Sequence, residues 1–211
     1  MWINRFKNKA GYTIIETMIS VSVFLVVIMY GMAALLNANL IHQKLQDMHS
    51  ILDNLSFIME DMSRNMRTGY NYQCFRKSTD PTGSDPTLSP ASLGAPRSCR
   101  DGWALAFEPT TGSSSTSIDQ WVYYFDTSTS IGKILKSTDG LTTSAIQLTP
   151  NEVDIDSISN FSVLGAPAPS AGDTGQPLVI IRLIGTITSK NSIVTPFSIQ
   201  TSISQRAVDV Q

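Results

Sequence analysis

Charged residues, histidines and cysteines are all scarce in this chain of 211 residues, and each scarcity argues against a class of function. Lys, Arg, Asp and Glu together make up 15% of the sequence, and the formal net charge is −2. A protein that grips the phosphate backbone of a nucleic acid needs a surplus of Lys and Arg. We therefore expect no direct binding of nucleic acid. The length suits one medium domain with an attached extension.

Sequence motifs for metal binding or catalysis are also missing. The two histidines, His42 and His49, are seven positions apart, and no thiol or carboxylate pattern completes a metal site around them. Two acidic groups lack the spacing of an EF-hand, and solvated turns explain them more simply. No G-x-S-x-G, P-loop or HExxH motif occurs, so we expect no enzyme, no cofactor and no metal. The acidic groups are Asp80 with Asp85, and Glu152 with Asp154 and Asp156.

Two cysteines, Cys74 and Cys99, are the only ones in the sequence. They belong to no CxxC or Cys/His pattern, which leaves either a disulfide or two unrelated thiols. The disulfide is favoured, because the segment between them is rich in Pro, Ser and Gly and needs a covalent clasp. A disulfide would place this part of the chain in an oxidising compartment.

One segment near the N-terminus, Thr17 to Ile41, has no formal charge and is long enough to cross a bilayer as a helix. Arg5, Lys7 and Lys9 precede it, so the positive-inside rule places the N-terminus in the cytoplasm and the rest outside the cytoplasmic membrane. A secretory signal peptide has the same order of basic and apolar residues. The length of this segment, and the lack of an A-x-A-like site at its end, favour a membrane anchor.

The helical pattern continues beyond the uncharged segment. Apolar residues recur every three or four positions, which predicts one stripe along a helix that stops at Gly69. We expect one long helix with a membrane-embedded half, 12–41, and an amphipathic half, 42–69, whose Met-rich stripe packs on a domain. The stripe consists of Met48, Ile51, Leu52, Leu55, Ile58, Met59, Met62 and Met66.

The remaining residues, 70–211, are predicted to form a β-rich extracytoplasmic head. Residues 70–100 contain a proline-rich stretch and are predicted to be a loop. The apolar run from Leu178 predicts a central buried strand, Pro196 an edge strand or a bulge, and a phase break near Ile158 a bulge. The fold class is therefore α+β, with the long helix on a mostly antiparallel sheet. Strands are predicted at 103–107, 121–125, 132–137, 144–149, 153–165, 178–188 and 193–206.

The start of the long helix carries a more specific motif. A basic leader is followed by GYTIIE at positions 11–16 and then by the uncharged segment. This order resembles the class III leader of type IV prepilins, a family that includes the pseudopilins of type II secretion systems. The resemblance implies a pilin-like fold, cleavage of the leader 1–11 between Gly11 and Tyr12 by a prepilin peptidase, and N-methylation of Tyr12. Tyrosine stands where the family usually has phenylalanine.

Glu16 is the one acid at the start of this apolar helix. An ionised carboxylate costs roughly 2.5–3.5 kcal/mol at the centre of a bilayer. Near the helix start that cost is lower and the helix dipole favours an acid, so a tolerated interfacial glutamate is one explanation. The resemblance implies another, in which Glu16 pairs with the new amino terminus of a neighbouring subunit and sets the stagger of a filament.

The resemblance implies that the chain is a minor subunit of a type IV pilus-like or type II secretion pseudopilus filament. Its length and the Pro-rich loop after a Met-rich helix resemble the J-type minor pseudopilins, which are associated with the filament tip and with priming. The expected partners are a prepilin peptidase, other pilins or pseudopilins, and the membrane. The alternative is a membrane-anchored binding or sensory module that does not assemble. A surface-anchored hydrolase lacks a nucleophile motif.

Overall fold

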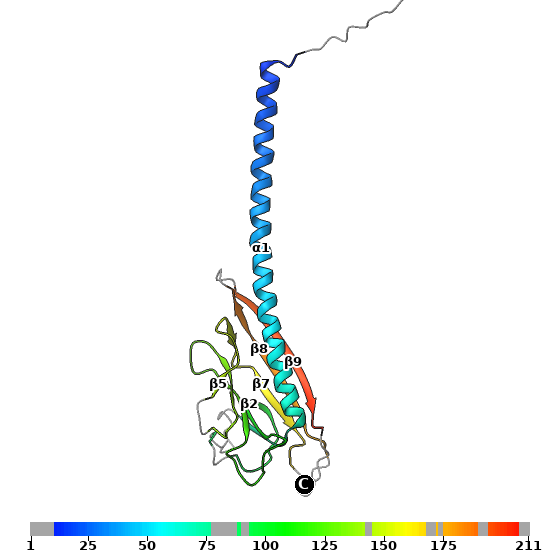
Figure 1. The fold of residues 1–211 in the computed structure, drawn as a ribbon, viewed down its shortest axis with the longest axis vertical. Helices are drawn as coiled ribbons and strands as arrows, with labels where there is room; N and C mark the ends of the chain where they lie inside the picture. The colour runs from blue at the N-terminus through cyan, green and yellow to red at the C-terminus, as the bar shows by residue number, and fades with distance from the viewer. Residues whose placement is uncertain are drawn as a thin grey trace, which may run out of the picture. The chain divides into compact units, whose positions relative to one another are not determined.

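The computed structural model describes residues 11–76, 88–89, 93–141, 145–167, 172, 175–189 and 194–206. Three leader cations and one acidic pair of the sequence analysis lie outside these residues: Arg5, Lys7, Lys9, Asp80 and Asp85. The chain divides into two units, 1–46 and 47–211, and each is described by itself. One helix, α1 (Ile14–Thr68), begins in the first unit and ends in the second (Figure 1).

The second unit holds one antiparallel sheet of nine strands against the last part of α1, which confirms the predicted α+β layout. Its main strand order is β5-β4-β3-β2-β7-β8-β6, with β1 paired to β2 and β9 paired to β8. The strands are β1 (Tyr70–Arg76), β2 (Cys99–Glu108), β3 (Trp121–Asp126), β4 (Lys133–Ser137), β5 (Ile146–Gln147), β6 (Val153–Ile155), β7 (Asn160–Leu164), β8 (Leu178–Thr188) and β9 (Val194–Ser204).

The predicted apolar stripe of α1 is the seam between the helix and the sheet. Leu55, Met62 and Met66 are completely buried, and they share one core cluster with the inward-facing side chains of β8. The helix ends where predicted, because Gly69 N–H donates to the carbonyls of Asn65 and Met66, each at 3.1 Å. A side chain at Gly69 would meet the ring of Phe107, so the stop also requires a small residue.

Polar contacts also join α1 to the strands β3 and β4. Lys136 Nζ on β4 lies 3.4 Å from Asp61 Oδ2 and 4.3 Å from the centre of the Trp121 ring. One turn further along α1, the Asn65 amide donates to the Tyr123 hydroxyl at 3.0 Å. The ammonium group is thus held between a carboxylate and an aromatic face.

Replacing Lys136 with methionine is expected to lower the free energy of unfolding by about 1 kcal/mol, since a cation–π contact and an ion pair are both lost. Methionine keeps most of the aliphatic stem, so the change reports on the charge. Chemical denaturation of the purified chain measures the difference, and Lys136→Arg is the control that keeps a cation. An unchanged stability in Lys136→Met would contradict the prediction.

The first seven residues of the predicted 70–100 loop are in fact a strand, β1, so that prediction is corrected. Tyr70, Tyr72 and Cys74 alternate with Asn71 and Gln73, which is a strand pattern that the neighbouring proline-rich stretch obscured. The strand pairs with β2, and the N–H of Cys74 and the C=O of Tyr72 form hydrogen bonds with the backbone of Arg97. Of the rest of the predicted loop, only 88–89 and 93–98 lie within the described residues before β2 begins.

The predicted disulfide joins Cys74 of β1 to Cys99 of β2, with 5.6 Å between the two Cα atoms. Both cysteines are buried, and the bridge lies beside Gly102 of β2. A Cβ atom at Gly102 would overlap both sulfur atoms. Glycine is therefore the residue that fits at position 102 while the bridge is in place.

The strand predicted from Leu178 is central, as expected, but it is buried on one face only. Val179, Ile181 and Leu183 point into the core, whereas Ile180 and Ile184 on the other face are half-buried. The strand lies between β9 on one side and β7 with β6 on the other, and β9 is the predicted edge strand. The phase break predicted near Ile158 falls in the interruption between β6 and β7, which leaves two strands instead of one.

A buried carboxyl group lies at the far end of β2. Glu108 is fully buried, and its Oε1 accepts a hydrogen bond of 2.6 Å from the Gln120 side-chain amide. Its Oε2 has no hydrogen-bond partner among the described residues. Burial raises the pKa of the Glu108 carboxyl, and the nearby Asp119 carboxylate raises it further, against the lowering effect of the Gln120 hydrogen bond.

This raised pKa predicts a pH dependence. The folded state favours protonated Glu108, so its contribution to stability is fully present below the ordinary carboxyl pKa and is lost as the pH rises through the raised value. Glu108→Gln should remove this dependence and increase the free energy of unfolding at pH 7 by about 1 kcal/mol. Denaturation of both proteins between about pH 4 and pH 8 tests it. Parallel curves for the two proteins would contradict the prediction.

Candidate functional site

The candidate processing and assembly site is the start of α1. Gly11, Tyr12 and Thr13 precede the helix in non-helical conformation, and Tyr12 is 81% exposed. A Cβ atom built at Gly11 meets nothing within 4 Å, so packing in the folded chain does not require glycine there. The backbone of the Gly11–Tyr12 bond is thus presented on an exposed, non-helical stretch directly before the helix.

Thr13 is the N-cap of α1, which is why the helix begins at Ile14 and not at Tyr12 as predicted. Its Oγ1 accepts a hydrogen bond of 3.3 Å from the N–H of Glu16, three residues later. Ser or Thr followed by Glu at the third helical position is the pattern of a capping box. The sequence analysis missed this local role of T-x-x-E, although the four letters alone would have indicated it.

Glu16 lies in the first turn of α1, where a carboxylate interacts favourably with the helix dipole. Its side chain is exposed, and its carboxylate makes no ion pair with another described residue. It is also the single residue with a formal charge from Ile14 to Ile41. The acid is therefore available to a cation from outside the chain.

The segment that follows Glu16 has the surface of a membrane helix. Its large apolar side chains are exposed all around, and the helix is long and apolar enough to cross a bilayer, which is consistent with a single-pass membrane protein. Thr17, Ser20 and Ser22 donate their hydroxyl protons to backbone carbonyls three or four residues earlier. Such bonds satisfy the hydroxyls inside the helix, as a lipid environment requires.

Two other groups of the sequence analysis form no metal site in the described residues. His42 and His49 are exposed on α1, and His42 contacts Gln46 at 3.2 Å. Asp154 accepts a backbone hydrogen bond of 2.7 Å from Gly132, and Asp156 accepts one of 3.2 Å from Ile158. No group of three or more His, Cys, Asp or Glu side chains converges anywhere in the part of the chain that the structure describes.

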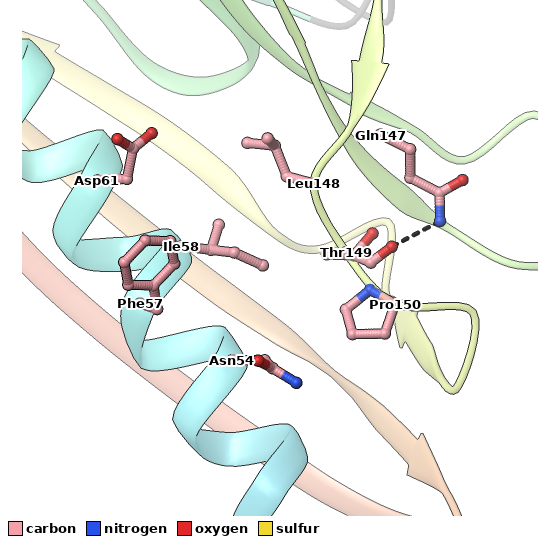
Figure 2. A pocket seen from close by; sticks show the side chains of 8 residues that line it. All are labelled: Asn54, Phe57, Ile58, Asp61, Gln147, Leu148, Thr149 and Pro150. Atoms are coloured by element: carbon pink, nitrogen blue, oxygen red, sulfur yellow. Dashed lines mark hydrogen bonds between the residues drawn. The ribbon is translucent and has the colours of Figure 1, made fainter.

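A second candidate site lies in the second unit, between α1 and the segment after β5 (Figure 2). It is a groove of about 390 Å³, in which Ile58 and Leu148 extend toward each other from the two sides. Phe57, on the helix side, is 74% exposed. The sequence analysis missed Phe57, whose signal is a lone aromatic outside the stripe. The lining residues are Asn54, Phe57, Ile58, Asp61, Gln147, Leu148, Thr149 and Pro150.

Asp61 in the groove binds Lys136, and the other polar side chains of its lining are amides and the hydroxyl of Thr149. What the groove offers is an apolar floor with a polar rim, which suits an aliphatic or aromatic side chain of a protein partner.

Comparison with known proteins gives no relative: no family model, no curated protein and no solved structure matches the chain.

Proposed function

We propose that this chain is a structural subunit of a type IV pilus-like or type II secretion pseudopilus filament, without catalytic activity. One observation carries the proposal. An exposed Gly11–Tyr12 junction stands directly before a capped, uncharged helix whose first turn holds the single unpaired acid, Glu16. A peptidase needs an accessible backbone outside regular secondary structure, and this stretch is exposed and non-helical. The glycine, which local packing leaves unexplained, is the residue after which prepilins are cut.

In this proposal the leader 1–11 is removed and Tyr12 is N-methylated. The helix then crosses the cytoplasmic membrane once, with the head outside, until the subunit enters a filament. Glu16 pairs with the positive N-terminus of a neighbouring subunit, because a charge pair in apolar surroundings is strong and permits one stagger. The length of the chain supports a minor position near the tip, where the subunit primes assembly together with other pilins or pseudopilins.

The first experiment is intact mass measurement of the membrane-extracted protein from cells with and without a prepilin peptidase. We expect a chain that starts at methylated Tyr12 when the peptidase is present and a chain that starts at Met1 when it is absent. Gly11→Leu should block processing. Gly31→Ala is the matched control, because Gly31 also has open space around it but lies within α1.

Retention of residues 1–11 in the presence of the peptidase would overturn the proposal. The second candidate would then be a membrane-anchored binding module, and the groove beside Phe57 is the observation that favours it. Cleavage beyond residue 36 would instead indicate an ordinary secretory signal.

A further inference from the structure

The solvent side of α1 in the second unit has one large apolar side chain among acids. Phe57 is 74% exposed, and Asp53, Glu60 and Asp61 lie one turn away from it along the helix. Asp61 is engaged by Lys136, whereas Asp53 and Glu60 make no ion pair with another described residue. We refer to Asp53, Asn54, Phe57, Glu60 and Asp61 as the front face.

The front face also has a place to receive a side chain. The groove shown in Figure 2 opens beside Phe57 and is floored by Ile58 and Leu148. A smaller hollow of about 210 Å³ continues it along the helix past Ser50 and Glu152. An exposed aromatic beside an apolar groove with an acidic rim is the composition expected of a contact surface for a partner that is apolar and positively charged.

The opposite side of the sheet has the complementary composition. The pairings Asn160 with Arg182, Ser162 with Ile180 and Leu164 with Leu178 place these six side chains on one face, since directly paired residues share a face. Leu164 is 44% exposed. We refer to Asn160, Ser162, Leu164, Leu178, Ile180, Arg182 and Ile184 as the back face.

Arg182 is the centre of the back face. It is exposed and lies between half-buried Ile180 and Ile184 on the same strand. The β9 residues opposite these three are Gln200, Ser202 and Ser198. No acidic side chain belongs to β7, β8 or β9. Asp154 of β6, opposite Thr186 on the same face, accepts a hydrogen bond from the Gly132 N–H. Front and back are opposite sides of one layered unit, because α1 packs on the face of β8 that carries Val179, Ile181 and Leu183.

We propose that the front face of one copy of this chain binds the back face of a second copy. Phe57 packs against Ile180 and Ile184, Arg182 reaches Asp53 and Glu60, and an aliphatic side chain such as Leu164 enters the groove. The two surfaces match in length. Asp53 to Asp61 spans about 12 Å at 1.5 Å per residue, and Ile180 to Ile184 spans about 13 Å at 3.3 Å per residue.

A contact between two different faces leaves one front and one back free, so further copies can add in the same direction. The front-to-back contact itself does not depend on the proposed function. The proposed function enters only in saying where the contact occurs, which is in a run of copies at the start of a filament. A subunit confined to the very end of a filament would use one face, whereas a run of copies uses both.

The test mixes two variants of the full-length protein in detergent and measures mass by sedimentation. Phe57→Asp disables the front face and Arg182→Glu disables the back face; both side chains are exposed, so the core is unaffected. We expect the wild type to form dimers and larger species as concentration rises. Each variant alone should need at least about tenfold more protein to associate, the effect of losing a central contact residue. An equimolar mixture should form dimers and nothing larger, because one front and one back remain intact.

Ile118→Asp and Arg206→Glu are the matched controls, since they make the same charge changes at exposed positions outside the two faces. They should associate like the wild type. Any one of three results would overturn the inference. The single variants could associate at the same concentrations as the wild type, the mixture could remain monomeric, or the wild type could form dimers and nothing larger. A chain that is processed at Gly11 but does not stack overturns this inference alone. A chain that stacks without being processed overturns the proposed function alone.

Discussion

Replacing Glu16 with alanine should leave leader cleavage and membrane insertion intact but reduce incorporation into filaments at least tenfold. Glu16 is the single residue with a formal charge from Ile14 to Ile41, and no cation of the described chain forms an ion pair with it. A charge pair with a neighbouring amino terminus is worth several kcal/mol in apolar surroundings, and alanine removes one partner. The measurement is the ratio of this protein in sheared filaments to that in membranes, by quantitative immunoblot.

The structure supplies the control for this experiment, because Glu16 also belongs to the capping pattern of α1. Thr13→Ala removes the hydrogen bond that the Glu16 N–H donates to Thr13 Oγ1 but keeps the carboxylate. If the acid serves only to cap the helix, Thr13→Ala and Glu16→Ala should reduce incorporation equally. Docking through the charge predicts that Thr13→Ala incorporates nearly normally and that Glu16→Gln fails like alanine. Normal incorporation of Glu16→Ala would rule out the docking role.

Met62→Ala should destabilise the second unit by about 3 kcal/mol, the usual scale for truncating a fully buried side chain. Met62 has no exposed surface and lies in the seam between α1 and the sheet. The loss combines the transfer of apolar atoms with the cavity that the surrounding side chains fill only in part. Urea denaturation monitored by tryptophan fluorescence measures it, because Trp121 packs against the same core cluster.

Ser56→Ala is the matched control for Met62→Ala, since Ser56 is exposed on the same helix. Its effect should stay within about 0.5 kcal/mol. A loss of less than about 1 kcal/mol in Met62→Ala would mean that the helix packs on the sheet less tightly than the structure indicates.

The long helix and its seam could be predicted from the sequence because two helical patterns follow each other without a break. The first is an uncharged apolar segment, and the second is an apolar stripe that recurs every three or four residues up to Gly69. Apolar side chains at every third or fourth position have few alternatives to one buried stripe, and glycine stops the helix at a definite place. The start was less predictable. Thr13 ends the non-helical stretch through a hydrogen bond to Glu16, and a hydropathy pattern contains no information on such a bond.

The sheet was harder to predict because strand pairing depends on residues far apart in sequence. Leu178 to Thr188 is almost continuously apolar, yet alternate side chains stay half-buried or exposed, since α1 packs against the other face of the strand. The strand from Tyr70 was not predicted, because the proline-rich stretch that follows it gave the whole range 70–100 the composition of a loop. Of the candidate sites, the proposed processing motif is local, so the six consecutive residues 11–16 are enough to suggest it. The groove could not be predicted in this way, because its lining residues come from α1 and from the segment after β5, which are far apart in sequence.

The disulfide and Gly102 restrict each other. The two sulfur atoms fill the space that any side chain at position 102 would occupy. A larger residue there is therefore compatible with the folded second unit only if the bridge is removed. Exchanging both cysteines for alanine should therefore make Gly102→Ala tolerable, although each change is harmful in the other's absence. Along any route by which such a chain diverges, these three positions are expected to change together or to stay as they are.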